Sequence, residues 1–337
     1  MKYLSFFSGI GGFEMGLHRE IPNATCVGYS EIDKYALKVY KHHFPTHRNL
    51  GDITKISTRM FMSLLRREGC DLIIGGFPCT NLSSMSRFNG NSNGLSGPHS
   101  KLIYPLSRLI KIAANMNPAL NIVIENNASM RNEDVIKITK ILESSVGKQL
   151  YVTELNSQDF GLQKRRRLFW TTFPIKQPKG SSSQTWKDVL KPVSTVKHLA
   201  LSKRMVTNTI NGTITNRLSS TGMSSFAIPH GKGWKIIEKP SRFVTRLSGP
   251  YVQDTKRAYA VPITTGNASV TLIDRRPRGY VLIRGMHTNE VERLFSFPDG
   301  YMGGMKRTPA SKLLGNSVHI GVVRHVFRHL KRHAKTS

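Results

Sequence analysis

The sequence predicts an α/β fold built on a doubly wound sheet, followed by a small, irregular, β-rich region. In the first 172 residues, short apolar runs alternate with stretches whose apolar residues recur at helical spacing. From about Pro174 onward, Thr, Ser, Pro and Gly dominate and only short β-like pieces remain. Hydrophobic residues make up 39% of the 337 residues, enough to form a core without disulfides or metals.

The expected strands are six short runs rich in apolar and β-branched residues. Amphipathic helices are expected between them, for example over residues 34–43 and 101–116, where apolar side chains share one face. Strands are expected at residues 3–7, 26–30, 70–75, 121–125, 151–156 and 167–172.

The second half of the chain is expected to contain fewer regular elements. Its β-like pieces are residues 235–238, 259–263 and 269–273, and helices are expected at 288–295 and 317–331. These changes in composition predict three segments: 1–175, 176–278 and 279–337. No internal repeat is visible.

The charge of the chain points to a polyanionic partner. Fifty Lys and Arg against twenty Asp and Glu leave a net charge of +30. Residues 1–150 hold 18 basic and 11 acidic residues, net +7, and residues 151–337 hold 32 and 9, net +23. Nucleic acid is therefore the first expected partner and an anionic membrane surface the second, with the contact surface mostly C-terminal.

Only three cysteines occur, Cys26, Cys70 and Cys79, too few for a disulfide framework or a four-cysteine zinc site. We therefore expect a reducing compartment and no bound metal. No run of 18 apolar residues occurs, so no membrane helix is expected. The apolar N-terminus is broken by glycines and followed by Glu14, which favours a buried strand over a secretion signal.

A glycine-rich turn follows the first predicted strand. Residues 7–13 read Phe-Ser-Gly-Ile-Gly-Gly-Phe, and glycines there permit a tight turn and a close approach of the backbone to a ligand. Glu31 ends the second strand about twenty residues later, where an acid can accept hydrogen bonds from ribose hydroxyls. Asp52 ends the next segment and could accept from an adenine amino group. Either acid alone would be a surface residue or helix cap, but together they favour a nucleotide-like ligand.

Two chemically active side chains end later strands. Cys79 follows Gly-Gly-Phe-Pro at the sheet edge where open α/β sheets bind ligands, whereas Cys26 and Cys70 are expected to be inert buried thiols. Glu125 ends an otherwise apolar strand, and its partial burial would favour the protonated form that donates a proton.

Two further motifs could serve either a structural role or a ligand-binding role. In Gln163-Lys164-Arg165-Arg166-Arg167, Lys164 and Arg166 fit a solvated face or a phosphate clamp, while strand alternation would turn Arg165 and Arg167 to one side. Gly315-Asn316-Ser317-Val318 is expected to open the last helix, as a cap or as a ligand contact.

In this order, these motifs resemble the cytosine-5 DNA methyltransferase family over the whole chain. The resemblance includes Glu125-Asn126-Asn127, although Thr80 and Asn127 depart from the residues common in the family. It extends to residues 284–299, with Glu290, Arg293, Phe297, Pro298 and Asp299. No regulatory domain is visible, so the chain is similar to minimal, stand-alone members of restriction-modification type.

The resemblance implies the fold and the ligands. The fold would be a Rossmann-like doubly wound sheet that binds S-adenosylmethionine, over residues 1–175 and, after the chain's return, 279–337; residues 176–278 would form the target-recognition domain. The methyl donor would be S-adenosyl-L-methionine, with S-adenosyl-L-homocysteine as product. The implied donor-binding residues are Phe7, Gly9, Gly11, Gly12, Glu31, Ile32, Asp52, Ile53, Pro78, Leu102, Asn316, Ser317 and Val318.

The implied partner is double-stranded DNA, bound by a monomer in the cytoplasm or wherever the DNA lies, and not by a secreted protein. A loop at residues 80–99 would close over a flipped base, and arginines of the basic region would contact phosphates or guanine edges. The candidate DNA contacts are Ser83, Ser84, Arg87, Ser96, His99, Arg242, Arg246, Arg257, Arg275 and Arg276.

The implied chemistry is covalent catalysis. The Cys79 thiolate would attack carbon 6 of cytosine and make carbon 5 nucleophilic. Protonated Glu125 would donate to N3, Arg165 would hydrogen-bond O2, and Arg167 would orient these groups or the DNA backbone.

Three alternative functions fit the sequence less well. The branch that acts on transfer RNA carries a Cys-Phe-Thr in its target region, and no cysteine follows Cys79 here. A silent DNA-binding relative would not need Cys79, Glu125 and Arg165. Enzymes that methylate exocyclic amines carry Asn/Asp-Pro-Pro-aromatic where this chain has Gly-Phe-Pro-Cys-Thr.

Overall fold

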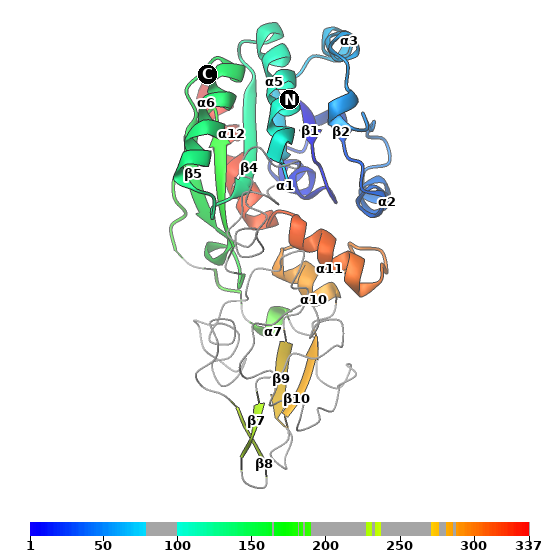
Figure 1. Cartoon of the computed structure of the whole chain (residues 1–337), viewed down its shortest axis with the longest axis vertical. Coiled ribbons are helices and arrows are strands. Elements are labelled where there is room, and N and C mark those ends of the chain that lie inside the picture. Colours follow the sequence, from blue (N-terminus) through cyan, green and yellow to red (C-terminus); the bar gives the residue numbers. More distant parts are fainter. Residues whose placement is uncertain are drawn as a thin grey trace. The chain divides into compact units, whose positions relative to one another are not determined.

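A computed structural model describes residues 1–78, 100–163, 165–180, 182–184, 186–189, 227–230, 233–236, 271–275, 281–285 and 288–336. The chain divides into two compact units (Figure 1). The first unit comprises Met1–Asn156, Arg166–Lys179 and Ile320–Ser337, and the second comprises Ser157–Arg165 and Gly180–His319.

A six-stranded sheet forms the centre of the first unit, in the order β2-β1-β3-β4-β6-β5. β1 pairs in parallel with β2 and β3, and β3 with β4, whereas β6 runs antiparallel to both β4 and β5. The strands are β1 (Lys2–Phe6), β2 (Thr25–Ser30), β3 (Leu72–Gly76), β4 (Asn121–Asn127), β5 (Tyr151–Asn156) and β6 (Arg166–Thr171). All six expected strands are confirmed, with ends shifted by two residues at most.

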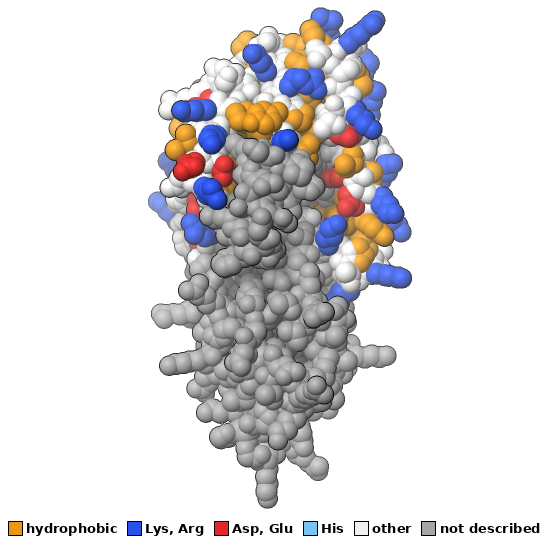
Figure 2. All heavy atoms as spheres, in the orientation of Figure 1, with side chains coloured by type: hydrophobic (Ala, Val, Ile, Leu, Met, Phe, Trp, Pro, Cys, Tyr) orange, Lys and Arg blue, Asp and Glu red, His pale blue; other side chains and the backbone are white. Residues whose placement is uncertain are grey.

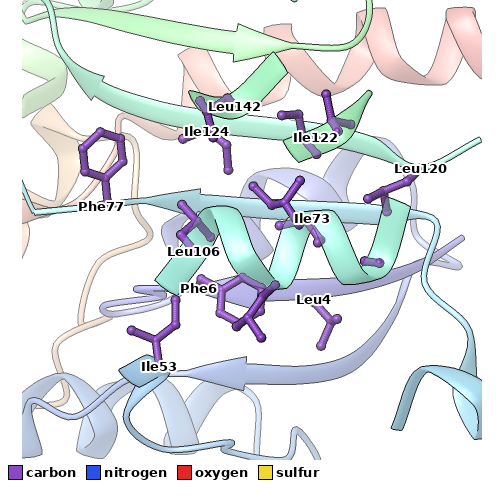
Figure 3. Close-up of a cluster of buried hydrophobic side chains, with 14 of the residues drawn as sticks. Leu4, Phe6, Ile53, Ile73, Phe77, Leu106, Leu120, Ile122, Ile124 and Leu142 are labelled. Carbon is purple, nitrogen blue, oxygen red and sulfur yellow. The ribbon is translucent and has the colours of Figure 1, made fainter. Parts of the chain in front are cut away.

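Helices cover both faces of this sheet. Alternate residues of β1, β3 and β4 pack against α3, α5 and α6 on one face, and Figure 3 shows Leu106 of α5 over Phe6, Ile73 and Ile124. α1 and α12 pack together on the other face, where Tyr40 of α2 hydrogen-bonds Glu14 of α1. The helices are α1 (Gly12–Glu20), α2 (Lys34–His43), η1 (Ile53–Lys55), α3 (Thr58–Glu68), η3 (Ser100–Leu102), α5 (Ile103–Met116), α6 (Asn132–Val146) and α12 (Ile320–Thr336).

The contact between α1 and α12 leaves no room for a side chain at Gly16. A Cβ atom there would lie 2.5 Å from Cγ1 of Val323. The apolar face of α12, with Val323, Val326, Phe327 and Leu330 fully or almost fully buried, is therefore part of the core of the first unit.

The described part of the second unit consists of short helices and two antiparallel hairpins, β7 with β8 and β9 with β10. The expected piece at 235–238 lies two residues earlier, the piece at 269–273 overlaps β9, and residues 259–263 lie outside the described part. The elements are η4 (Ser157–Asp159), α7 (Trp186–Val189), β7 (Ala227–His230), β8 (Gly233–Ile236), β9 (Thr271–Arg275), β10 (Val281–Gly285), α10 (Thr288–Leu294) and α11 (Arg307–Asn316).

The expectation that Gly315-Asn316-Ser317-Val318 opens the last helix was wrong. These residues end α11, where Ser317 is the extended C-cap residue, and α12 begins only at Ile320. No helix was expected over the residues of α11, which holds Pro309 in its first turn. Proline is tolerated in the first turn of a helix, where the backbone N–H groups have no partner within the helix.

None of the described helices has both the length and the apolar character needed to cross a bilayer. On the face shown in Figure 2, Lys and Arg side chains are scattered over the described surface and outnumber Asp and Glu.

A buried polar cluster lies between β1, β2, α1 and α2. Glu14 has no exposed surface, and Oε1 accepts a hydrogen bond from the Tyr40 hydroxyl at 3.1 Å. The same hydroxyl lies 3.1 Å from Nδ1 of His47, while the Tyr3 hydroxyl lies 3.0 Å from Nε2 of His18. Burial raises the pKa of Glu14 to about 7 and lowers the pKa of His47 to about 4, so the cluster holds an uncharged imidazole beside a carboxyl that titrates near neutrality.

We predict that Glu14→Gln stabilises the protein at alkaline pH. Because the pKa of Glu14 is higher in the folded than in the unfolded chain, the stability it contributes is fully present below the unfolded pKa and is lost as pH rises through about 7. Glu14→Gln should remove this loss, which is about 2 kcal/mol between pH 5.5 and 8.5, as measured by urea unfolding at these two pH values. The exposed Glu133→Gln is the control; an unchanged pH slope in Glu14→Gln would contradict the assignment.

Candidate active site

Four parallel strands of the first unit end at one edge of the sheet, where open α/β folds bind ligands. The glycine-rich turn, Glu31 and Phe77-Pro78 follow β1, β2 and β3, and β4 itself ends with Glu125-Asn126-Asn127. The residues of the first unit that were predicted to bind the methyl donor and the target cytosine are therefore brought to this edge.

The glycine-rich turn adopts a left-handed backbone at three positions. The φ angles are +55° at Phe7, +56° at Gly9 and +87° at Gly11, and Gly11 N–H donates to the Ser8 carbonyl at 2.9 Å. Glycine reaches this region without a steric penalty, whereas Phe7 is strained there. A Cβ atom at Gly9 would meet nothing within 4 Å, so the turn presents open backbone beside β1.

Glu31 locks the turn to the end of β2. Its Oε2 accepts from Gly9 N–H at 2.8 Å, and its Oε1 accepts from the N–H groups of Ile32 and Asp33 at 2.7 and 2.8 Å. Because each carboxylate oxygen can accept about two hydrogen bonds, Oε2 keeps capacity for one more donor, such as a hydroxyl.

Asn49 ties the two expected donor acids together and was missed by the sequence analysis. Its Oδ1 accepts from Gly51 N–H at 2.9 Å and lies 3.4 Å from Glu31 N–H, while its Nδ2 donates to the Glu31 carbonyl at 3.2 Å. The only signal in the sequence was an asparagine shortly before Gly-Asp, a pattern typical of turns in general. One side chain thus fixes the spacing between the Glu31 and Asp52 segments.

Asp52 is the N-cap residue of η1 and stays ionised. Its Oδ1 accepts from Thr54 Oγ1 at 2.7 Å and Thr54 N–H at 2.9 Å, and the hydroxyl contact is the main cause of its lowered pKa. Of the apolar residues predicted here, Ile32 is 68% exposed, Leu102 is partly buried and Ile53 is buried in the core. Ile32 is therefore an apolar surface free to pack against a planar ring.

Glu125 is held by two features of its neighbours. Its Oε1 lies 2.8 Å from Arg167 Nε, and a Cβ atom at Gly76 would lie 2.7 Å from its Oε2. Gly76 therefore allows the carboxylate to approach the β3 backbone, while the ion pair compensates for its burial. The sequence led us to expect a partly buried acid that is paired or protonated, and Arg167 orienting either the catalytic groups or the DNA backbone; the ion pair favours the first of these roles.

Asn126 fixes the backbone just before the predicted nucleophile. It is 2% exposed, and its Nδ2 donates to the Phe77 carbonyl at 3.1 Å, two residues before Cys79. Asn126 Oδ1 accepts from Asn127 N–H at 2.7 Å, so its amide is oriented by a bond at each end. The amide thereby joins the ends of β3 and β4.

Arg165, in the second unit, has partners different from those of Arg167. It is 4% exposed, and its Nη2 donates to the carbonyls of Gly315 at 2.9 Å and Ser317 at 2.7 Å. Arg166, on β6, forms an exposed ion pair with Glu154 on the neighbouring strand β5. The three arginines of one short motif therefore bind a backbone segment, a surface acid and the candidate catalytic acid.

Three sets of residues from the sequence analysis remain: two cysteines expected to be inert, one arginine in a described strand, and residues that the structure does not describe. Burial raises the pKa of the Cys26 and Cys70 thiols to about 12, which supports their expected inertness. Arg275 lies in β9, but its side chain is not described. Outside the described residues are Cys79, Ser83, Ser84, Arg87, Ser96, His99, Arg242, Arg246, Arg257 and Arg276.

The family model for C-5 cytosine-specific DNA methylase matches residues 1–332. The chain belongs to this family. The methylase is 25% identical over 340 residues to Type II methyltransferase M.HhaI of Haemophilus parahaemolyticus, covering 97% of this chain and 93% of that protein. It is 25% identical over 326 residues to Type II methyltransferase M1.ScrFI of Lactococcus lactis subsp. cremoris, covering 96% and 76%.

Solved structures share the fold of the methylase. Spodoptera frugiperda DNMT2 superposes with a TM-score of 0.60 at 17% identity, covering 98% of this chain and 99% of that one. Entamoeba histolytica methyltransferase EhMeth gives a TM-score of 0.59 at 16% identity, covering 99% and 98%. The α/β methyltransferase fold and the resemblance expected from the motifs are confirmed, and the enzyme is a DNA (cytosine-5-)-methyltransferase.

We predict that Asn126→Asp slows methyl transfer by at least about tenfold, because a carboxylate cannot donate to the Phe77 carbonyl. Steady-state methylation of cytosine-containing duplexes measures the effect. The matched control is Asn121→Asp at the start of the same strand, where a carboxylate can still accept from Thr172 Oγ1 and only the long, exposed 3.4 Å bond from Nδ2 to the Ala119 carbonyl is lost. Equal rates for Asn126→Asp and wild type would show that this bond does not position the nucleophile.

Proposed function

We propose that the enzyme methylates carbon 5 of a cytosine flipped out of a specific short sequence in duplex DNA, through a covalent adduct with Cys79. The observation that carries this proposal is the arrangement at the ends of β3 and β4. There Glu125 lies against Gly76 and pairs with Arg167, and Asn126 holds the Phe77 carbonyl. A nucleophile two residues after Phe77 would work beside this acid.

The methyl donor is proposed to be S-adenosyl-L-methionine, which supplies an electrophilic methyl group and leaves as S-adenosyl-L-homocysteine. The described residues fit such a molecule: open backbone at Gly9, spare acceptor capacity on Glu31, ionised Asp52 and exposed Ile32. Glu31 would accept from ribose hydroxyls and Asp52 from the adenine amine. The other proposed contacts are Phe7, Gly11, Gly12, Ile53, Pro78, Leu102, Asn316, Ser317 and Val318.

Catalysis would depend on stabilising charge in the attacked ring. Glu125, paired with Arg167 in the structure, would first have to take up a proton; it would then donate this proton toward N3 while the thiolate bonds carbon 6, so that negative charge does not build up on the pyrimidine. A base would then remove the carbon 5 proton and the thiolate would leave. Because Arg167 contacts Glu125 directly, we assign the O2 contact first expected of Arg165 to Arg167. Arg165 would instead organise the Gly315–Ser317 backbone.

Target choice is proposed for residues 176–278, between a catalytic region at 1–175 and its return at 279–337. The net charge of +23 over residues 151–337 supports a phosphate-binding surface there. The 80–99 loop would add contacts near the flipped base. We further propose a monomer that acts where DNA is present in the cytoplasm and that needs no metal.

We predict that Cys79→Ala abolishes methylation but binds DNA within about threefold of wild type, because only the covalent step needs the thiolate. Bisulfite sequencing of DNA from expressing cells would show both the modified cytosines and the bases around them. Cys26→Ala is the control that removes a thiol elsewhere. Methylation by Cys79→Ala at the wild-type rate would refute the covalent mechanism.

We also predict that DNA affinity falls about a thousandfold between roughly 50 and 200 mM salt, because phosphate contacts release counterions. Fluorescence anisotropy with cognate and scrambled duplexes measures it. Arg275→Ala should reduce the salt slope by about one on both duplexes if Arg275 binds phosphate, or weaken only cognate binding if it reads a base. A salt-independent affinity would contradict the phosphate contacts.

A further inference from the structure

His319 lies fully inside the second unit, directly after the Gly315–Val318 segment. It is 3% exposed. Its Nε2 lies 3.5 Å from the Ser296 hydroxyl, and its imidazole also hydrogen-bonds the backbone of Leu294. The histidine therefore contacts the residues on both sides of Phe295, at the end of α10.

Phe295 in turn packs on the guanidinium of Arg165. The Arg165 Cζ atom lies 5.4 Å from the centre of the Phe295 ring, within the range of a cation–π contact. Ser296, the next residue, has a φ of +62°, a strained value for a residue other than glycine. Contacts that fix Leu294 and Ser296 therefore also fix the ring beneath Arg165.

The loop that carries Arg165 also packs against His319. A Cβ atom at Gly161 would lie 3.0 Å from Nε2 of His319 and 2.8 Å from Oε1 of Gln184, so this loop has no room to shift toward the imidazole. Gln184 Oε1 accepts from Leu162 N–H at 3.2 Å, which holds the loop from the same side.

Arg165 connects this packing to Asn316. Its Nη2 donates to the carbonyls of Gly315 and Ser317, on either side of Asn316. The orientation of the Asn316 peptide therefore depends on where the guanidinium sits. Burial and the nearby Arg165 lower the pKa of His319 to about 3, so the imidazole is neutral at physiological pH and adds no second positive charge beside Arg165.

We propose that His319 is a positioning residue for the methyl donor: through Phe295 and Arg165, it fixes the backbone around Asn316 in the orientation that binds the donor. The inference rests on the proposed role of residues 316–318 as donor contacts. His319 itself touches neither donor nor cytosine.

A matched pair of substitutions tests this role. His319→Gln keeps one N–H donor and one oxygen acceptor, whereas His319→Met has a chain of similar length without either group. His319→Met should raise the donor KM by about tenfold while kcat changes less than about threefold, and His319→Gln should stay within about threefold of wild type in both. Titration calorimetry with S-adenosyl-L-homocysteine should show the same loss of affinity without turnover.

Three results separate the alternatives. If His319→Met leaves both KM and the affinity for S-adenosyl-L-homocysteine unchanged, the positioning role is refuted. If His319→Met and His319→Gln lose activity equally, in proportion to a fall in melting temperature, His319 is merely structural and the proposal is again overturned. Methylation at carbon 5 by wild type tests the proposed function independently of either variant.

Asn316→Ala tests the donor assignment on which the inference rests. Loss of donor affinity in Asn316→Ala together with His319→Met supports the chain of contacts. If Asn316→Ala binds the donor normally, the assignment of this segment fails, and with it the inference. Faster hydrogen exchange of residues 315–318 in His319→Met would in that case show only that His319 orders this backbone, and the role in donor binding would still be refuted.

Discussion

The ion pair between Arg167 and Glu125 depends on β6 running antiparallel beside β4. In this register Asn127 faces Arg167 and Glu125 faces Phe169, which brings the guanidinium within 2.8 Å of the carboxylate. A buried acid without a cation would be costly, and an apolar strand such as β4 supplies no compensation of its own. The sixth strand is therefore as important to the active site as the four parallel strands that end there.

The first unit fixes its ligand-facing loops through hydrogen bonds between polar side chains and backbone groups. Glu31 accepts from three N–H groups, Asn49 bridges two segments and Asn126 holds the Phe77 carbonyl. Such bonds position peptide groups as well as side chains. A loop held this way needs little reordering when a ligand arrives, which lowers the entropic cost of binding.

The strands, and most helices between them, could be predicted because their hydrophobic period is set by the local sequence. β5 was predicted to the residue, while α11, which holds Pro309 in its first turn, was not predicted. The order of motifs was sufficient to identify Glu31, Cys79 and Glu125 as candidates. Arg167 was expected to orient either the catalytic groups or the DNA backbone. The choice between these, and the role of Asn49, could not be predicted, because both depend on which distant segments the sheet and its turns bring together. An asparagine shortly before Gly-Asp has the same local sequence whether its side chain links two segments or only forms part of a turn.

The close packing of α12 on Gly16 has a consequence for synthesis of the protein. Helix α1 leaves the ribosome long before the helix that packs against it, which begins only at Ile320. A nascent chain thus carries an uncovered apolar surface on α1 until α12 has emerged, and a premature stop codon before residue 320 leaves that surface uncovered permanently. Quality-control proteases would meet such truncated chains as incompletely folded, however intact their N-terminal motifs.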